Sequence, residues 1–475
     1  MELLSTENLL NSKLFQILKK VIEKLNIESY IVGGFVRDFL LNKKKSKDID
    51  IVCVGSGIDV AKALKKELHN SSKIQIFKNY GTAMFTWNDL VLEFVGARKE
   101  SYSIDSRNPN IKAGSLEDDQ NRRDFTINTL AISLNPLDFG EIIDPFNGLN
   151  DLKNKILRTP LHPDKTYSDD PLRMLRCIRF ACQLNFKIEE KSLKSIIKNK
   201  ERIKIISEER IIEEINKIIQ SKKPSYGFKI LDQTELLIFI LPELTNLKGV
   251  EEIDGFKHKD NFNHTLQVLD NICNSTNNIW LRWAALLHDI GKATTKKLIK
   301  NVGWTFYGHE FIGSKMVYKL FKRLKMPLNE KLKYVQKLIL MSSRPIIIAQ
   351  DIVTDAAVRR LVFDAGDDID DLISLCKADI TTKNKKKFSK YHKNFELVTN
   401  KIIEVEKRDK IRNFQPPIDG DYIMGYFNIK PCKEVGKIKE VIKEAILEGK
   451  IPNKKNAAFE LMKITGKELG LKTNE

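Results

Sequence analysis

The stretch Ser29-Tyr-Ile-Val-Gly-Gly-Phe-Val-Arg-Asp-Phe-Leu-Leu41, followed after a lysine-rich link by Asp48-Ile-Asp-Ile-Val-Cys53, decides how this chain folds. Residues Tyr30–Val32 predict a short strand, Gly33-Gly34 a turn without side chains, and Val36–Leu41 a helix. Such a turn presents backbone N–H groups at the start of a helix, where they suit a phosphate.

The second part of this stretch carries two carboxylates. The two-residue period of a strand places Asp48 and Asp50 on one face, while Ile49 and Ile51 point to the other. Like charges held this close are costly unless a cation lies between them, so the pair indicates a Mg²⁺ site for phosphoryl or nucleotidyl transfer. Asp-x-Asp alone more often marks a solvated edge strand. The preceding Gly-Gly-x-x-Arg-Asp favours the metal site.

Together these residues resemble the first motif of the nucleotidyltransferase superfamily. More narrowly, they resemble the bacterial-type (class II) tRNA CCA-adding enzymes and poly(A) polymerases. The resemblance implies that Asp48 and Asp50 are catalytic and hold Mg²⁺. It also implies that the nucleotide is bound by Gly33, Gly34 and Arg37.

A third catalytic carboxylate is expected at Glu93. The family completes its metal site with an acidic residue from a neighbouring strand, and Glu93 lies in the strand-like run Val91-Leu-Glu-Phe-Val95 after a predicted hairpin. A glutamate in a strand is otherwise usually just an exposed side chain.

The composition is that of a globular protein with several domains. At 475 residues the chain is too long for one ordinary core, and 42% of its residues are apolar. No apolar run approaches the roughly 18 residues of a membrane span, and the first residues lack the features of a signal peptide. We therefore expect a cytoplasmic protein without a membrane partner. The six scattered cysteines argue against disulfides and a zinc site.

The net charge of +18 comes from 81 Lys and Arg against 63 Asp and Glu. A surplus of this size points to a polyanion, either nucleic acid or an anionic membrane surface. AT-rich codon usage would also enrich lysine, so the charge supports an RNA partner without requiring one. Nothing in the sequence identifies a stable protein partner.

A second polar cluster lies in Arg122-Arg-Asp-Phe-Thr-Ile-Asn128. Arg122 and Arg123 offer fork-shaped donors for a triphosphate, and Asp124 and Asn128 can bond ribose hydroxyls. The spacing alone also fits the cap of a helix. The run resembles the family's second motif, which distinguishes ribose from deoxyribose, and this implies that all four residues bind the nucleotide.

The segment Ser168-Asp-Asp-Pro-Leu-Arg-Met-Leu-Arg-Cys-Ile-Arg-Phe180 resembles the fourth motif of the family. Pro171 suits a first helical position, which would make Asp170 an N-cap and an i,i+3 partner of Arg173. The family usually has Glu-Asp where this chain has Asp169-Asp170. The resemblance implies that the nucleotide is bound by Asp170, Arg173, Arg176 and Arg179.

Asp170 and Arg173 suggest how a pocket selects C and A without a nucleic-acid template. Cytosine and adenine both present an amino donor beside a ring-nitrogen acceptor, whereas uracil and guanine present a carbonyl beside N–H. Asp170 would accept from the amino group, and Arg173 would donate to the ring nitrogen. Both contacts become repulsive with uracil.

Three other segments resemble parts of the family. Residues 98–120 correspond to a flexible loop that A addition requires, and Asp144–Leu152 to a hinge. Ser207–Glu214 corresponds to a helix that braces the base-reading helix, although an ordinary surface helix has the same pattern.

A separate cluster of histidines and aspartates lies in the second half of the chain. Three of the seven histidines fall within 46 residues, and adjacent His-Asp ends an apolar helix. This pattern resembles the HD phosphohydrolase superfamily and predicts a second divalent-metal site. Related domains carry another histidine where this chain has Ser342-Ser343, which favours a single-metal or vestigial site. The predicted ligands are His264, His288, Asp289, His309 and Asp379.

The predicted fold is an α+β nucleotidyltransferase head followed by an all-α neck, an HD domain and a helical tail. The expected boundaries are residues 1–155, 156–245, 246–395 and 396–475. The implied activity is Mg²⁺-dependent addition of C, C and A to the tRNA 3′ end from CTP and ATP. The alternatives are a poly(A) polymerase, a partial CC- or A-adding enzyme, and a metal-dependent hydrolase acting through the HD domain.

Overall fold

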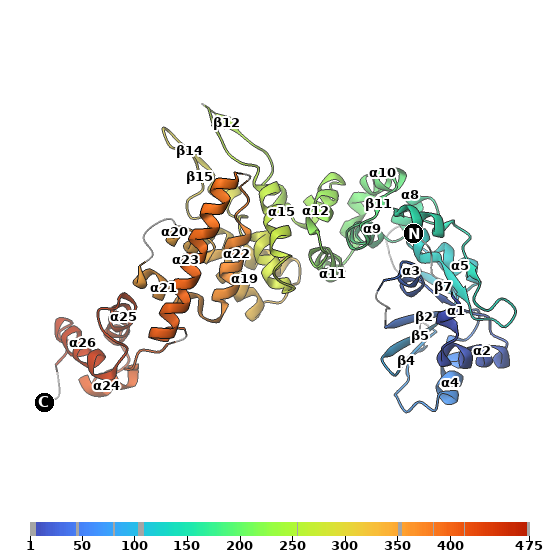
Figure 1. Ribbon diagram of the computed structural model, residues 1–475, viewed down its shortest axis with the longest axis horizontal. Helices are drawn as coiled ribbons and strands as arrows, with labels where there is room; N and C mark the ends of the chain where they lie inside the picture. Colours follow the sequence, from blue (N-terminus) through green and yellow to red (C-terminus); the bar gives the residue numbers. More distant parts are fainter. Residues whose placement is uncertain are drawn as a thin grey trace. The chain divides into compact units, whose positions relative to one another are not determined.

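The computed structural model describes residues 6–43, 47–78, 81–102, 109–253, 255–349, 354–382, 384–412 and 414–472. Residues 44–46 of the lysine-rich link and 103–108 of the expected flexible loop therefore lie outside the described residues. The chain forms two compact units, Met1–Pro242 and Glu243–Glu475, which are considered separately (Figure 1).

A mixed seven-stranded sheet forms the centre of the first unit. Strand β2 pairs antiparallel with β1 and parallel with β5. The order across the sheet is β3 (Gln75–Phe77), β4 (Thr82–Trp87), β5 (Leu90–Gly96), β2 (Asp48–Cys53), β1 (Ser29–Val32), β8 (Ala131–Ser133) and β9 (Ile142–Ile143). A separate hairpin pairs β6 (Arg98–Ser101) with β7 (Asn110–Ala113). The sequence predicted β1 and β5 to within one residue at each end.

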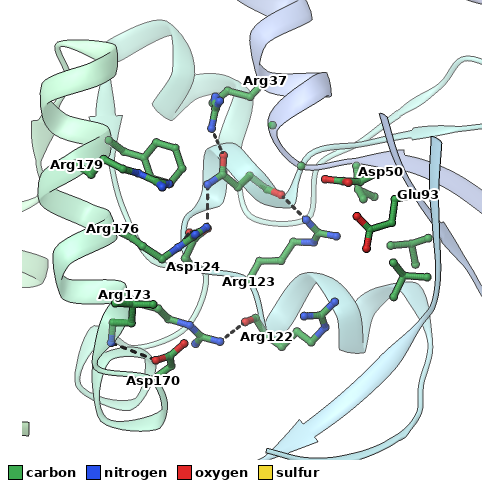
Figure 2. Close-up of a pocket in the computed structure, with 18 of the residues that line it drawn as sticks. Arg37, Asp50, Glu93, Arg122, Arg123, Asp124, Asp170, Arg173, Arg176 and Arg179 are labelled. Atoms are coloured by element: carbon green, nitrogen blue, oxygen red, sulfur yellow. Dashed lines mark hydrogen bonds and ion pairs between the residues drawn. The ribbon is translucent and has the colours of Figure 1, made fainter. Parts of the chain in front are cut away.

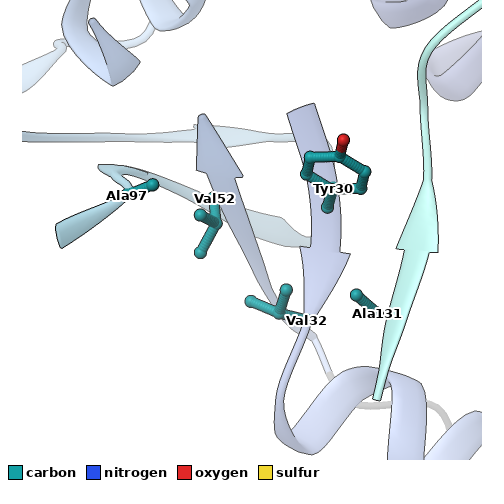
Figure 3. Packing of buried hydrophobic residues seen from close by; sticks show 5 residues of the cluster. All are labelled: Tyr30, Val32, Val52, Ala97 and Ala131. Carbon is teal, nitrogen blue, oxygen red and sulfur yellow. The ribbon is translucent and has the colours of Figure 1, made fainter. Parts of the chain in front are cut away.

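A cluster of buried apolar side chains holds the central strands together (Figure 3). Val52 follows Asp50 by two residues on the same strand face and is 2% exposed, and Val32, opposite Asp50 in the register, is fully buried. Full burial of such a side chain contributes about 1.5–3 kcal/mol. Packing therefore fixes the strand positions beside Asp50. The cluster is completed by Tyr30, Ala97 and Ala131.

Helices make up most of the rest of the first unit. Helix α3 starts directly after β1, at the Gly33-Gly34 turn. The amphipathic helix α2 buries Leu14, Leu18 and Val21. The helices are α1 (Glu7–Leu10), α2 (Lys13–Leu25), α3 (Gly34–Leu40), α4 (Gly57–Glu67), α5 (Leu116–Asn121), α6 (Thr126–Thr129), α7 (Gly148–Asn154), α8 (Pro163–Asp169), α9 (Leu172–Leu184), α10 (Glu190–Asn199), α11 (Glu208–Ile219), α12 (Pro224–Gln233) and α13 (Leu237–Ile240).

The expected all-α neck contains one short exception. Two-residue strands β10 (Ile156–Leu157) and β11 (Lys187–Ile188) pair in parallel. Helix α9 begins at Leu172, one residue later than the sequence suggested, because Pro171 occupies the N-cap position. The Asp170 carboxylate nevertheless accepts from the Leu172 N–H at 3.1 Å, as a capping residue does.

The second unit is helical, with two hairpins, β12 (Glu252–Ile253) with β13 (Phe256–Lys257) and β14 (Lys297–Ile299) with β15 (Gly303–Thr305). Its helices are α15 (Asn261–Ile272), α16 (Ile279–Leu287), α17 (Lys292–Thr295), α18 (His309–Arg323), α19 (Glu330–Met341), α20 (Arg344–Ile348), α21 (Asp355–Ala365), α22 (Ile369–Ala378), α23 (Lys385–Asp409), α24 (Gly420–Phe427), α25 (Lys433–Glu448) and α26 (Lys455–Glu468), with α14 (Pro242–Thr245) at the boundary between the units. In the part of the chain that the structure describes, no helix is both long and apolar enough to cross a bilayer.

Candidate active site

The expected nucleotide-binding residues gather around one pocket of about 810 Å³ in the first unit (Figure 2). Its walls come from the turn after β1, from β2 and β5, from the segment after α5, and from α9 and α11. Asp48, at the exposed start of β2, is outside this lining. The expected residues that line the pocket are Gly33, Gly34, Arg37, Asp50, Glu93, Arg122, Arg123, Asp124, Asn128, Asp170, Arg173, Arg176 and Arg179.

The parallel pairing of β2 with β5 brings the carboxylates together. Asp50 lies opposite Glu93 in the register, and Asp48 lies opposite Val91. Burial raises the pKa of Asp50, with the charge of Asp48 adding to the effect and Arg123 opposing it. Burial also raises the pKa of Glu93, together with the charges of Asp50 and Asp48. The three carboxylates repel one another. A divalent cation would stabilise them, because carboxylate oxygens are its preferred ligands.

Gly33 is required at the edge of this carboxylate group. Its φ of +76° is a conformation that residues with a Cβ rarely adopt. A Cβ at this position would lie 3.2 Å from Arg123 Nη1 and 3.4 Å from Asp50 Oδ2. The glycine therefore lets the Arg123 guanidinium and the Asp50 carboxylate both lie close to the backbone.

A buried aspartate that the sequence did not single out positions the adjacent arginines. Asp119 Oδ1 accepts from Arg122 Nε, and Asp119 Oδ2 accepts from Arg123 Nε, both at 2.9 Å. The Asp119 side chain is fully buried. Burial tends to raise the pKa of Asp119, but the two guanidinium groups outweigh it and lower that pKa. Asp119 lies in the first turn of α5, within the segment that the sequence assigned to the flexible loop.

Four of the expected residues form one hydrogen-bonded chain across the pocket (Figure 2). Arg176 Nε donates to Asp124 Oδ2 at 2.9 Å, and Asn128 Nδ2 donates to Asp124 Oδ1 at 2.9 Å. Arg37 Nη1 in turn donates to Asn128 Oδ1 at 2.8 Å. Although burial opposes ionisation, Arg176 and Asn128 lower the pKa of Asp124 to about 2. The first, second and fourth motifs are thus joined through one ionised carboxylate.

The Arg173 guanidinium is held largely by main-chain oxygens. Its Nη2 donates to the carbonyl of Arg122 at 2.6 Å, and its Nη1 to the carbonyl of Thr166 at 3.4 Å. Nη2 also lies 3.4 Å from the hydroxyl of Tyr102, which donates to Glu100 Oε2. Glu100 and Tyr102 lie near the start of the expected flexible loop, so this loop contacts the residue that is expected to read the base. Carbonyl partners leave no sequence signature, and these contacts were not predicted.

Helix α11 braces α9 through a buried ion pair. Arg179 Nη1 lies 3.2 Å from Glu214 Oε1, and both side chains are less than 10% exposed. The Arg179 guanidinium also lies 4.1 Å from the centre of the Phe180 ring. Burial lowers the pKa of Arg179, while Glu214 opposes that shift. The Arg179–Glu214 pair is thus a contact through which α11, the expected bracing helix, holds α9.

The second unit brings together the predicted HD residues. The Nε2 atom of His264 lies 2.8 Å from Asp379 Oδ1, and one ligand atom each of His264, His288 and Asp379 lie within 4.8 Å of one another. Asp289 lies 3.6 Å from His264, 3.4 Å from His288 and 3.6 Å from His309. All five predicted residues therefore share one cluster.

The orientation of the three histidines fits metal ligation. Each Nδ1 faces an oxygen at 2.8–2.9 Å: the hydroxyl of Thr381, the carbonyl of Ala285 or the carbonyl of Phe306. This leaves Nε2 of His264, His288 and His309 toward the aspartates, as in metal sites whose ligands are oriented by outer partners. The buried Nε2 of His288 has no hydrogen-bond partner among the described residues.

The neighbouring aspartates explain the raised pKa of His288. Burial lowers its pKa, but Asp289 and Asp379 outweigh burial and raise it to about 10. Burial tends to raise the pKa of Asp289, but His288 and Lys292 outweigh burial and hold that pKa well below its ordinary value. Ser342, at the position where an additional histidine was expected in related domains, is buried and donates to the Ile339 carbonyl.

Three family models match the chain in order. The "Poly A polymerase head domain" matches residues 29–158, and the "Probable RNA and SrmB- binding site of polymerase A" matches residues 185–248. The "HD domain" model matches residues 261–383. A curated "Multifunctional CCA protein" from Haemophilus influenzae is 36% identical over 318 residues, which are 63% of this chain and 71% of that protein. The chain belongs to the family of CCA-adding tRNA nucleotidyltransferases.

Members of this family are metal-dependent nucleotidyltransferases. An "A-adding tRNA nucleotidyltransferase" from Aquifex aeolicus is 42% identical over 192 residues, but the chain spans only 23% of that protein and the match covers 40% of this chain. The solved Thermotoga maritima CCA-adding enzyme complexed with tRNA has the same fold, with a TM-score of 0.62 at 22% identity over 98% of this chain and 100% of that one. The family assignment and the α+β head with helical regions are confirmed.

We predict that removing a pocket carboxylate abolishes nucleotide incorporation yet stabilises the metal-free protein. Asp50→Asn and Glu93→Gln each remove a charge that burial and repulsion destabilise. At pH 7.5 in EDTA, the melting temperature should rise by about 2–4 °C per kcal/mol of relieved repulsion. The gain should shrink as the pH falls and vanish below about pH 3, under the ordinary pKa values of 3.8 for Asp and 4.5 for Glu, because both carboxyls are then protonated in the folded and unfolded states alike.

Asp89→Asn is the matched control, because that carboxylate is 88% exposed and pairs only with the exposed Lys47 among the described residues. Its melting temperature should change by less than 2 °C. Lower melting temperatures for both pocket variants at pH 7.5 would contradict carboxylate repulsion.

Proposed function

We propose that this chain adds C, C and A to the 3′ end of tRNA from CTP and ATP and releases pyrophosphate. The observation that carries this proposal is the chain of hydrogen bonds from Arg176 through Asp124 and Asn128 to Arg37. It joins three expected motifs around a pocket that also holds Asp50 and Glu93. The expected domain boundaries and the cytoplasmic location stay predictions.

Asp48, Asp50 and Glu93 are the residues that would hold Mg²⁺. Carboxylate oxygens are ligands that this hard cation prefers. A cation would offset both the burial and the mutual repulsion that raise the pKa values of Asp50 and Glu93. When bound, Mg²⁺ lowers the pKa of the RNA 3′-hydroxyl and stabilises the departing pyrophosphate.

The arginines supply fixed positive charge for a triphosphate. Asp119 holds Arg122 and Arg123 in place before a nucleotide arrives, so less ordering is needed on binding. Guanidinium groups suit phosphate oxygens because they donate in a planar fork. Gly33 and Gly34 leave the backbone open to the phosphates on the same side of the pocket.

Asp124 is better described as a positioning residue than as a direct ribose ligand. Its two oxygens already accept from Phe125 N, Asn128 Nδ2 and both Nε and Nη2 of Arg176. A carboxylate has about four acceptor sites, so these contacts fill it. Asn128 and Arg176, which Asp124 orients, are then the groups that face the nucleotide.

The proposed base contacts remain at Asp170 and Arg173. In the described contacts Arg173 uses three of its five N–H donors, which leaves two for a ring nitrogen. Asp170 lines the same pocket and can accept from the exocyclic amino group of cytosine or adenine. Because Tyr102 and Arg122 also contact Arg173, they set the direction from which it approaches the base.

The direct test is to incubate a tRNA transcript lacking CCA with CTP, ATP and Mg²⁺ and to sequence the 3′ end. We expect C, C and A, with pyrophosphate released and no incorporation by Asp48→Ala. A single A added only to tRNA ending in CC would support the A-adding activity named for the A. aeolicus relative. A long A tail would instead indicate a poly(A) polymerase. Either result would replace the present proposal.

Base selection should depend on Asp170 and Arg173. Arg173→Ala and Asp170→Ala should reduce the preference for CTP and ATP over UTP and GTP by roughly 5- to 150-fold, the equivalent of about 1–3 kcal/mol per contact. The measurement is kcat/KM for all four nucleotides on one tRNA.

Arg210→Ala is the matched control, because Arg210 lines the same pocket from α11. It should lower kcat/KM for the four nucleotides by similar factors and leave their ratios unchanged. Unchanged selectivity in both Asp170→Ala and Arg173→Ala would contradict base reading. It would leave the two residues with only a structural role at the start of α9, as a helix cap and a brace.

For the HD cluster we predict weak or absent phosphatase activity. The histidine orientations support a divalent-metal site, but Ser342 and Ser343 supply no further imidazole for a second ion. Hydrolysis of 2′,3′-cyclic phosphate and phosphomonoesters should be assayed with Ni²⁺, Mn²⁺ and Mg²⁺. Robust turnover that His288→Ala abolishes, while CCA addition continues, would refute this prediction and support a hydrolase in the second unit.

A further inference from the structure

Three arginines of the proposed nucleotide pocket gather around the ring of Phe180. The guanidinium carbon of Arg179 lies 4.1 Å from the ring centre, and those of Arg37 and Arg176 lie 5.0 Å and 5.6 Å from it. Arg37 belongs to α3, whereas the other three residues belong to α9. All four line the pocket, and Figure 2 shows the three arginines together on one side of it. One aromatic ring is thus shared by three cations of the site.

Like charges held this close repel one another. Burial lowers the pKa of Arg179, and the charges of Arg176 and Arg37 lower it further, while Glu214 opposes the shift. The side chains of Arg37 and Arg179 are each less than 10% exposed, so water and salt screen the repulsion weakly. This wall of the pocket therefore needs groups that attract cations.

Carboxylates supply part of this attraction. Each arginine has an acidic partner, and the partners are Asp38 for Arg37, Asp124 for Arg176 and Glu214 for Arg179. A carboxylate accepts from N–H groups in the guanidinium plane, whereas an aromatic face attracts the whole cation through its quadrupole. Phe180 therefore offsets repulsion among the arginines without occupying any of their donors.

The arginines keep donors that these partners do not occupy. In the described contacts Arg37 uses three of its five N–H donors, two on Asp38 and one on Asn128. The buried Nε–H of Arg179 has no hydrogen-bond partner among the described residues. A further carboxylate in this wall would occupy such donors and would also cancel positive charge that a triphosphate needs. An aromatic ring has neither effect.

The Phe180 ring is fixed before any nucleotide binds. It is 7% exposed, and it meets the Phe125 ring at an angle of 83°, with the ring centres 5.7 Å apart. Phe125 is fully buried and directly follows Asp124, the carboxylate that orients Arg176. The same short segment thus holds both the shared ring and the acidic partner of one arginine.

We propose that Phe180 is a positioning residue for the nucleotide, because its aromatic face holds the three guanidinium groups at the pocket wall. The inference rests on the proposed nucleotide transfer in the first unit. Guanidinium groups that are already in place need less ordering when a triphosphate arrives, so loss of the aromatic face should weaken the binding of every nucleotide. The choice between bases should persist, because Arg173, the proposed base-reading arginine, is not one of the three.

The test replaces Phe180 in the full chain with monofluoro-, trifluoro- and pentafluorophenylalanine. Fluorine withdraws negative charge from the ring face and changes the shape of the ring little. Incorporation kinetics are measured for all four nucleotides on a tRNA lacking CCA. KM should rise with each step, by about 5- to 30-fold for pentafluorophenylalanine, with kcat and the ratios between nucleotides unchanged, as expected for lost ground-state binding. Phe180→Leu, which has no π face, should raise KM by a similar factor.

Fluorination of Phe228 is the matched control. Phe228 is fully buried in the first unit and does not line the pocket, so the same series at this position should leave KM unchanged. A second control separates the arginines from Phe125. In Arg179→Met, which lacks the cation nearest to the ring, fluorination at Phe180 should raise KM less, whereas an effect that acts through Phe125 would stay the same.

The melting temperature of each variant is measured beside its kinetics. KM values that stay level across the series, or that follow the melting temperature instead of the number of fluorines, would overturn the proposal and leave Phe180 as a packing residue. An equal rise of KM in Arg179→Met would overturn it as well. Absence of any incorporation by the unchanged chain would refute the proposed function itself, whereas normal incorporation with a level series would refute only the role of Phe180.

Discussion

The parallel pairing of β2 with β5 is the constraint on which the proposed active site depends. It places Asp50 directly opposite Glu93, with Asp48 two residues away, although these carboxylates repel one another. The repulsion is tolerated because Val32 and Val52 bury the adjoining strand positions and hold the register. A one-residue slip of either strand would move its carboxylate to the opposite face of the sheet. Hydrophobic packing therefore maintains an electrostatic arrangement that is unfavourable without a cation.

The positive side of the pocket uses buried carboxylates as anchors. Asp119 orients Arg122 and Arg123, Asp124 orients Arg176 and Asn128, and Glu214 orients Arg179. In each case the acid is buried while the cation lines the pocket. Removing such an anchor would leave a buried arginine without its ion-pair partner and would also let that arginine move. Mutations of an anchor and of its arginine should therefore have strongly non-additive effects.

Sequence reasoning predicted the elements and residues that follow a strong local pattern. The strand period placed Asp48 and Asp50 on one face, and the hairpin pattern before Glu93 predicted its strand. It did not identify Asp119, because the resemblance assigned residues 98–120 to a flexible loop and the contacts of Asp119 with Arg122 and Arg123 form only in the fold. Nor could it identify the carbonyls that hold Arg173 or the oxygens that orient the three HD histidines. Such partners are main-chain atoms or small polar groups brought close only by the fold.

All residues that line the proposed active-site pocket come before Pro242, where the first compact unit ends. Among the residues that the structure describes, those of the second unit contribute no wall, carboxylate or arginine to this pocket. Mutations after this boundary can therefore accumulate without altering the groups that line the proposed nucleotide pocket. Over evolutionary time, such a chain could lengthen, shorten or exchange its second half while its chemistry is inherited intact. The A. aeolicus relative, which matches this chain over only 192 residues at 42% identity, is consistent with that kind of history.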